Sequence, residues 1–195
     1  MTVKPLALDH AQRIGEIHAQ ALAGDFLPSL GSGFLAELYR GILGMGLGFG
    51  FVAEEGGVVL GFVIASNDTS DLFRRVMLRR AFPLGLKMLP ALIRRPVLIR
   101  NIIETFTYPK LEGEAAVSAE LVVIAVDSSF RSHGLGAALC SALDEDFRCH
   151  GVTQYKVTVN HSNDGANRFY LRQGFQLAHT FRLYGRGWNL YTKAL

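Results

Sequence analysis

Ala119–Gly136, AELVVIAVDSSFRSHGLG, is the stretch that decides how this chain folds. Its first part, Glu120–Val126, is a run of β-branched and apolar residues of strand length. Asp127, Ser128 and Ser129 end that run with turn-forming residues. Positions 131 to 136 then read R-x-x-G-x-G at the start of an amphipathic helix. The sequence therefore predicts a strand, a tight turn and a helix start in immediate succession.

The expected helix start has the chemistry of an anion-binding site. The first N–H groups of a helix have no partner within the helix, and the helix dipole adds about half a positive charge there. Gly134 and Gly136 would let a large anion approach these groups, and Arg131 adds a guanidinium suited to phosphate oxygens. We expect a phosphate or pyrophosphate here, with a plain strand-to-helix turn as the alternative. The stretch matches neither the P-loop pattern nor the dinucleotide-binding pattern G-x-G-x-x-G.

A second motif lies downstream, where Asn163–Phe175 reads NDGANRFYLRQGF. Together the two segments resemble the GCN5-related N-acetyltransferase (GNAT) superfamily, in which a strand is followed by R/Q-x-x-G-x-G/A. Later in that family come Asn, Ala three residues on, Phe-Tyr and Gly-Phe. The matching residues here are Asn163, Ala166, Phe169, Tyr170, Gly174 and Phe175. The resemblance covers roughly the second half of the chain.

The resemblance implies one α/β acetyltransferase domain over residues 1–195, with a mixed, mostly antiparallel sheet of about seven strands flanked by helices. Residues 3–67 show the β-α-α-β-β order with which this fold usually begins. Residues 114–195 form the expected acetyl-CoA-binding half. Between the halves, residues 68–113 are a basic insertion with helices at about 68–110, which we expect to form a lid or wall. No internal repeat appears.

The pattern of apolar residues and turn signals predicts the individual elements. The expected strands are Val3–Leu8, Gly48–Glu54, Val58–Ala65, Glu120–Val126, Thr153–Asn160, Phe175–Leu183 and Trp188–Thr192. The expected helices are one to Ala21 with a capping box at Asp9 and Gln12, one capped by Ser32, Leu72–Phe82, Leu84–Ile93, Val97–Phe106, one from Leu135 to Gly151, and Ser162–Arg172. Pro83, Pro90 and Pro96 are expected to separate the helices of the insertion.

The positive charge of the chain is concentrated in the insertion. Leu72–Lys110 contains one acid, Glu104, against Arg74, Arg75, Arg79, Arg80, Lys87, Arg94, Arg95, Arg100 and Lys110. Three interpretations stay open: a solvated helical face, a site for an anionic acceptor such as a phosphorylated or nucleotide-linked sugar, and contact with an anionic membrane surface. A nucleic-acid partner is not expected, because no basic platform with interleaved aromatic residues is present.

Composition limits the class of protein. The net charge of +3 is modest. Cys140 and Cys149 have no metal-ligand spacing, so we expect small core residues in a reduced cytoplasm and no metal. The N-terminus shows no signal peptide, and the apolar stretch Ile42–Val52 is too short and too rich in glycine to span a bilayer. We expect a cytoplasmic protein, and a homodimer is an open alternative.

The resemblance implies which residues bind the cosubstrate, acetyl-CoA. The backbone of Ile124, Ala125 and Val126 would pair with its pantetheine arm, as in members of the family. The pyrophosphate would lie on the turn formed by Arg131, Ser132, His133, Gly134, Leu135, Gly136 and Ala137. Asn163 would contact the cosubstrate, and a helix-capping role is compatible with that contact.

Two residues are candidates for catalysis. Glu120 is a carboxylate within an apolar strand, where an acid is costly unless it is solvated or used. The sequence A-E-L-V also resembles the histone acetyltransferase branch of the superfamily, which implies a glutamate general base at this position, often acting through water. The alternatives are a solvated strand end or a pair with an arginine of the insertion; Glu114 is a weaker candidate. Tyr170 corresponds to the tyrosine that lies near the CoA sulfur in the family and would donate a proton to the thiolate. Its alternative is a core aromatic residue.

The histidines are weaker candidates. His161 follows a strand near the expected cleft and could serve as an auxiliary base. His10, His18, His150 and His179 are expected at the surface or at helix caps.

These observations favour an N-acetyltransferase that moves the acetyl group of acetyl-CoA to a primary amine by direct attack in a ternary complex. The acceptor would be a small molecule, with amino sugars and nucleotide sugars as candidates, or a peptide. The alternative is a non-catalytic module that binds or senses acyl-CoA.

Overall fold

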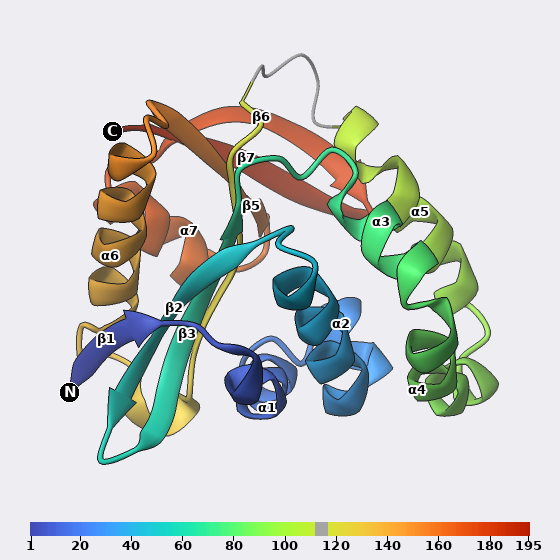
Figure 1. The fold of residues 1–195 in the computed structure, drawn as a ribbon. Helices are drawn as coiled ribbons and strands as arrows, with labels where there is room; N and C mark the ends of the chain where they lie inside the picture. Colours follow the sequence, from blue (N-terminus) through green and yellow to red (C-terminus); the bar gives the residue numbers. More distant parts are fainter. Residues whose placement is uncertain (112–116) are drawn as a thin grey trace.

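A computed structural model describes residues 1–111 and 117–195, with side chains described for 1–105 and 117–195. Seven strands form one sheet in the order β1-β2-β3-β4-β5-β7-β6 (Figure 1). Neighbouring strands are antiparallel except for β4 and β5, which are parallel. The expected α/β class and the mixed, mostly antiparallel sheet are therefore confirmed. The strands are β1 Thr2–Pro5, β2 Phe49–Glu55, β3 Val58–Ser66, β4 Glu120–Val126, β5 Gln154–Asn160, β6 Gln176–Leu183 and β7 Arg186–Ala194.

Helices cover both faces of the sheet. α1 and α2 pack on one face, and α6 and α7 pack on the other (Figure 1). The expected stripe of α6 is confirmed, because Leu135, Leu139, Leu143 and Phe147 are all buried. These helices are α1 Ala11–Ala21, α2 Ser32–Gly44, α6 Leu135–Cys149 and α7 Asp164–Arg172, with short 3₁₀ turns η1 Leu8–His10, η2 Leu27–Leu30 and η3 Ser128–Phe130.

The parallel strands β4 and β5 touch at one end only. Their one paired position in the described residues is Glu120 opposite Lys156, and there the Lys156 N–H donates to the carbonyl of Ala119 at 3.0 Å. On its other side, β4 pairs with β3 from Glu120 to Val126, with one register shift between Ile64 and Ala65 of β3. The two central strands therefore fork just after Glu120, and the edge of β4 that faces β5 is open beyond that point.

The backbone groups along this open edge can be assigned from the ladder. The N–H of Asp127 donates to the carbonyl of Leu60 at 2.8 Å, so that residue faces β3. Backbone groups alternate along an antiparallel strand. Val126 and Ile124 therefore turn their N–H and C=O groups away from β3 and into the fork.

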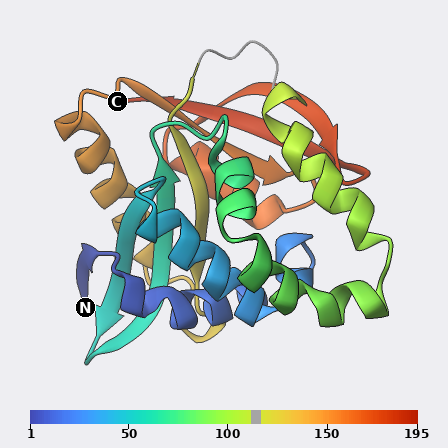
Figure 2. The same cartoon turned by 45° about the vertical axis from the view of Figure 1, so that its right-hand side comes forward.

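The insertion forms a third layer outside α2 (Figure 2). Its helices are α3 Leu72–Arg79, α4 Ala81–Arg94 and α5 Leu98–Leu111. The expected breaks at Pro83 and Pro90 are wrong. Pro83 is the third residue of α4, where an N–H has no partner within the helix in any case, and Pro90 lies inside the helix at the cost of one hydrogen bond. The first break falls at Arg80 instead, between α3 and α4.

Two of the expected helix starts also differ. Asp9 and Gln12 form no capping box, because Gln12 donates to Glu16 instead and α1 has no side-chain cap. Ser32 is the first residue of α2, and Gly31 occupies the capping position. The cap of α7 is confirmed: the side chain of Asn163 accepts a hydrogen bond from the N–H of Ala166 at 3.1 Å.

The two cysteines lie on different sides of α6. Cys140 is buried in the core as expected, whereas Cys149 is exposed, so the core assignment of Cys149 is wrong. Among the residues that the structure describes, no helix combines the length and apolar character needed to cross a bilayer.

Two helical glycines offer a matched test of the packing. A Cβ on Gly15 of α1 would lie 2.9 Å from the backbone N of Ala36 and from the carbonyl of Ser32 in α2, whereas a Cβ on Gly85 of α4 would meet nothing within 4 Å. We expect Gly15→Ala to lower the free energy of unfolding by roughly 1–3 kcal/mol through overpacking. Gly85→Ala should raise it by about 0.5–1 kcal/mol through helix propensity. Urea unfolding measures both, and changes of the same sign would contradict the close α1–α2 contact.

Candidate active site

The fork between β4 and β5 opens into a cavity of about 760 Å³. This volume falls in the range typical of sites for small molecules and cofactors. The cavity runs from the start of α6, past β4, β5 and α7, to the inner faces of α1, α2 and the insertion. Its lining includes Glu120, Ile124, Ala125, Val126, Asn163 and Tyr170, together with Arg131, Ser132, Gly134, Leu135, Gly136 and Ala137 from the turn.

The start of α6 has the features of an anion site. Gly134 is the N-cap with φ of 77°, in the left-handed region that favours glycine. The N–H groups of Leu135, Gly136 and Ala137 belong to the first turn of the helix and have no acceptor within it. A Cβ on Gly136 would lie 3.3 Å from the ring of Phe169, so glycine also lets α7 pack closely here. These N–H groups and the positive end of the helix dipole favour an anion at this end of the cavity.

Arg131 and His133, both in the turn expected to hold the pyrophosphate, are placed differently relative to the cavity. Arg131 lines the cavity, and its Nη2 donates to the carbonyl of Ala21 at 3.2 Å. His133 is exposed, does not line the cavity, and places its Nδ1 2.8 Å from the carbonyl of Arg131. The ring of His133 therefore contacts the backbone of the turn, while Arg131 lines the cavity.

Glu120 lies at the point where the strands fork. It is buried, and its Oε2 accepts a hydrogen bond from the hydroxyl of Thr69 at 2.6 Å. The ammonium of Lys156, also buried, lies 3.9 Å from the same oxygen. The expected alternative of a solvated strand end is wrong, because Glu120 is buried. The carboxylate is engaged by Thr69 and Lys156 and still lines the cavity.

Tyr170 lies against the cavity with its ring packed in the core of α6 and β5. Its side chain is buried, and its hydroxyl has no hydrogen-bond partner among the described residues. Burial, with a smaller contribution from Cys140, raises the pKa of Tyr170 well above its ordinary value. The phenol therefore keeps its proton at neutral pH and remains able to donate it.

His18 was expected at the surface or at a helix cap, and that expectation is wrong. The side chain is buried, lines the cavity, and forms a hydrogen bond between its Nδ1 and the hydroxyl of Tyr39. Burial lowers the pKa of His18 from 6.5 to about 4, so the ring is neutral at physiological pH. Burial also raises the pKa of Tyr39. A signal was present in the sequence: His18 follows Ile14 and Ile17 on the apolar side of α1.

The end of the cavity beyond Glu120 is mainly apolar and aromatic. Its wall includes Phe26, Leu27, Leu38, Ile42, Phe73, Tyr184 and Trp188. Asp25 adds a carboxylate there, which lies 3.5 Å from the amide nitrogen of Asn160 and 3.8 Å from a guanidinium nitrogen of Arg186. Burial raises the pKa of Asp25, and these two partners oppose that effect.

The insertion closes this end of the cavity. The hydroxyls of Thr105 in α5 and Tyr184 lie 2.9 Å apart, and Oε2 of Glu104 accepts from the N–H of Tyr184 at 2.6 Å. Thr105 and Phe73 both line the cavity. The insertion is therefore a wall fixed to the β6–β7 turn, as the expectation of a lid or wall implied.

The expected auxiliary base His161 lies outside the site. His161 is exposed, is absent from the cavity wall, and pairs its Nδ1 with Oδ1 of Asn189 at 3.1 Å. Glu114 lies outside the described residues. Within the part of the chain that the structure describes, no three His, Cys, Asp or Glu side chains are placed to hold a metal ion together.

Comparisons with known proteins agree with this geometry. Residues 100–175 match the model of a family described as "Acetyltransferase (GNAT) family", and no curated protein matches the chain. A ribosomal-protein-alanine N-acetyltransferase from Brucella melitensis is 14% identical with a TM-score of 0.63, over 100% of both chains. Paia N-acetyltransferase from Thermoplasma acidophilum, solved in complex with coenzyme A, is 13% identical with a TM-score of 0.58, over 100% of both chains. The Salmonella typhimurium protein yncA, solved with its cofactor acetyl-CoA, is 15% identical with a TM-score of 0.62, over 100% of this chain and 93% of its own.

The buried His18 predicts a pH dependence of stability. Its pKa is about 4 when folded and 6.5 when exposed, so between these values the unfolded chain binds the proton more readily. The free energy of unfolding should therefore fall as the pH decreases, by roughly 2 kcal/mol near pH 5 from this group alone. Urea unfolding of the wild type and of His18→Gln at neutral pH and near pH 5 measures the difference. The variant should lack this part of the loss, and equal losses in both proteins would show that His18 is not buried in its neutral form.

Proposed function

We propose that this chain transfers the acetyl group of acetyl-CoA to a primary amine by direct attack in a ternary complex, because residues 100–175 match the GNAT acetyltransferase family and the fold resembles that of solved N-acetyltransferases. The observation that carries the proposal is one cavity that joins the helix-start anion site to Glu120 and Tyr170. Acetyl-CoA needs a site for its diphosphate, a channel for its extended arm and a reaction centre at the end of that arm. The cavity offers these three features in that order along β4.

The residues that would hold the cosubstrate follow the fork. The N–H groups of Leu135, Gly136 and Ala137 and the guanidinium of Arg131 would take the diphosphate. The open edge of β4 offers the N–H and C=O groups of Ile124 and Val126 to the pantetheine arm, which would complete hydrogen bonds that the fork leaves unmade. Asn163 caps α7 beside this channel and lines the cavity, so its capping role and a contact with the cosubstrate are compatible.

Glu120 would act as the general base. A protonated alkylamine has a pKa near ~10, so only a very small fraction is nucleophilic at neutral pH and proton removal limits the reaction. A positioned base contributes about 10²–10⁴ in rate. Thr69 and Lys156 hold the carboxylate of Glu120 in place at the apex of the fork. Glu120 is buried there, so little solvent reaches its side chain.

Tyr170 would act as the general acid. Its phenol is protonated, lines the cavity and has no described hydrogen-bond partner, so it can donate to the thiolate that leaves when the amine attacks the thioester. The proton passes from the tyrosine oxygen to the sulfur, and the proton from the amine goes to Glu120. The two groups line one cavity from different elements, β4 and α7.

The acceptor end favours an amine carried on an apolar or aromatic group. Its wall is formed largely by such side chains, and the carboxylates of Asp25 and Glu120 would attract the protonated amine before it reacts. The sequence-level candidates, an amino sugar or nucleotide sugar and a peptide, remain proposals to be separated by assay.

A non-catalytic acyl-CoA-binding module is the second candidate. The engagement of Glu120 by Thr69 and Lys156 favours it, because a carboxylate held by two partners can be purely structural. Both functions require acetyl-CoA binding, and only the enzyme releases free CoA in the presence of an amine.

The helix-start site is tested by two glycines with the same backbone conformation. Gly134 has φ of 77° and Gly151 has φ of 75°, and a Cβ on either would meet no protein atom within 4 Å. Valine at either position is strained, but only valine at position 134 would block approach to the α6 N–H groups. We expect Gly134→Val to weaken CoA binding by about tenfold or more and Gly151→Val to leave it nearly unchanged, as measured by calorimetry. Equal affinity of both variants would place the diphosphate elsewhere.

The base is tested by Glu120→Gln, which keeps the shape and removes the charge. With an amine found by screening amino sugars, polyamines, amino acids and N-terminal peptides for thiol release, we expect kcat/KM to fall by about 10²–10⁴ at neutral pH. The loss should shrink at high pH, where the amine is already neutral, and CoA affinity should persist. Tyr170→Phe should lower kcat in the same assay. An unchanged pH–rate profile for Glu120→Gln would remove the base assignment, and no thiol release with any amine would favour the module.

A further inference from the structure

Helix α4 carries apolar side chains on two opposite sides. Leu84 and Met88 face inward and are buried against α2. Phe82, Leu86, Leu89 and Ile93 are exposed, at 84%, 60%, 51% and 72%. At 100° per residue these four fall within about one sixth of the helix circumference, opposite the buried side. A surface helix normally has a polar outer face, so this outer stripe, which we call the α4 ridge, requires an explanation.

Exposed apolar residues are concentrated around the α4 ridge. Eight of the fourteen large apolar side chains that are exposed in the described residues lie between positions 78 and 103. Besides the ridge itself, they are Leu78, Val97, Ile99 and Ile103. Scattered exposed apolar residues are ordinary, but a gathering of this kind on one helical layer indicates a surface that contacts something apolar.

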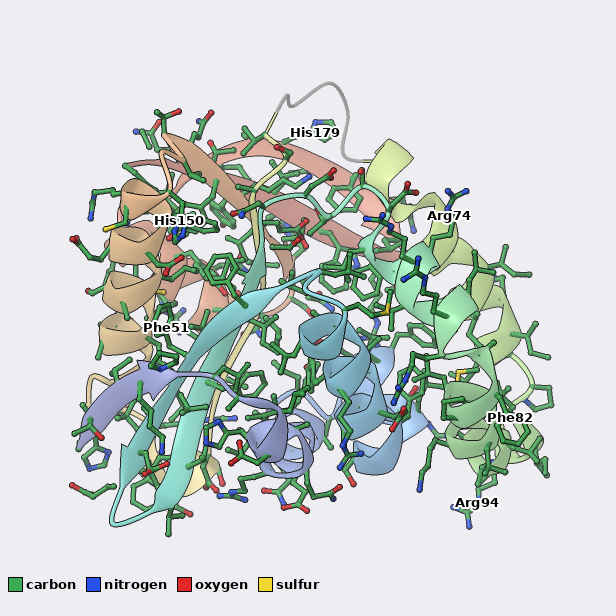
Figure 3. The ribbon with its side chains drawn as sticks, in the orientation of Figure 1. Phe51, Arg74, Phe82, Arg94, His150 and His179 are labelled. Carbon is green, nitrogen blue, oxygen red and sulfur yellow. The ribbon has the colours of Figure 1, made fainter. Side chains whose placement is uncertain are left out.

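The same layer carries cations without acidic partners. Arg79, Lys87, Arg94 and Arg95 are exposed and form no ion pair with any described residue. Figure 3 shows Phe82 and Arg94 at the outer side of α4, pointing away from the sheet, and Arg74 on the outer side of α3. Arg74 and Arg100 pair within the insertion, with Asp71 and Glu104. The α4 ridge is therefore bordered by free positive charge.

We propose that the α4 ridge binds the surface of an anionic lipid bilayer, with its apolar side chains in the interfacial region and the neighbouring arginines and lysine at the lipid phosphates. This combination of one apolar stripe with flanking cations is the physical pattern of a helix that lies in the plane of a membrane. Each cation near an anionic surface adds attraction that falls off within a Debye length.

Two other occupants fit the observations less well. A second copy of the chain, packed ridge to ridge, would bring Arg79, Lys87, Arg94 and Arg95 of both copies together with no acid between them. A rigid protein partner would be expected to meet a groove, but none of the four ridge residues lines either cavity of this region. A convex apolar ridge enters a deformable lipid interface without needing a complementary shape.

The ridge is separate from the reaction site. Among the described side chains of the insertion, Phe73 and Thr105 line the cavity. Binding at the ridge would leave the cavity wall intact, so the two proposals can be tested independently.

The test is sedimentation of the full chain with vesicles of phosphatidylcholine alone or mixed with phosphatidylglycerol. We expect the wild type to bind the anionic vesicles, to bind the neutral ones far less, and to lose binding as salt increases. The double variant Leu86→Glu, Ile93→Glu should bind anionic vesicles about tenfold more weakly or worse, because it removes two apolar side chains and adds two negative charges. Both side chains are exposed, so folding should be unaffected, and retained CoA affinity checks this.

Leu177 provides the matched control. It is 54% exposed on β6, outside the insertion, so Leu177→Glu should leave vesicle binding unchanged. The proposal is overturned if the wild type shows no preference for anionic vesicles, or if Leu177→Glu weakens binding as much as the double variant. It is also overturned if light scattering shows that the wild type dimerises in the absence of lipid and that only the double variant is monomeric, which would assign the ridge to a second copy.

Discussion

The separation of β4 from β5 is the constraint on which the rest of this structure depends. One paired position, Glu120 opposite Lys156, joins the two strands, and beyond it they diverge. Divergence leaves the backbone groups of Ile124 and Val126 without strand partners in the middle of a sheet, where an unmade hydrogen bond is expensive. An extended ligand with its own amide groups would satisfy them. The fork thus creates the cavity and leaves hydrogen-bonding groups of β4 exposed to it.

The apex of the fork also determines the electrostatics of the site. Glu120 and Lys156 are both buried there, and a buried ion pair is stable only when further hydrogen bonds support it, as Thr69 does. Thr69 is the second residue of the insertion, so this hydrogen bond ties the insertion to β4 at the apex of the fork. Its far end is tied to the β6–β7 turn through Thr105 and Tyr184. The insertion therefore lines the cavity with its inner side chains, while the apolar side chains of the α4 ridge are exposed on its outer side.

Local patterns predicted the strands and most helices because each depends on a short-range cause. Glu120–Val126 matches β4 in full, the glycine pair at 56 and 57 forms the β2–β3 turn with positive φ, and Asn163 caps α7. Prolines were misleading for an equally local reason. Pro83 lies in the first turn of α4, where its missing N–H costs nothing, and Pro90 is tolerated in the helix interior. Sequence alone does not say where in a helix a proline will fall.

The sequence by itself determined the α/β class, the helix start after Gly134 and the strand that carries Glu120, since periodicity, glycine positions and turn residues act over a few neighbours. Only the tertiary structure decided which distant side chains meet. Lys156 is buried beside Glu120, which lies 36 positions earlier in the chain. His18, expected at the surface or at a helix cap, lines the cavity with Tyr39. Each of these partnerships joins residues far apart in the chain, and the physical reason is that the packing of helices on a forked sheet, and not any local preference, sets their environment.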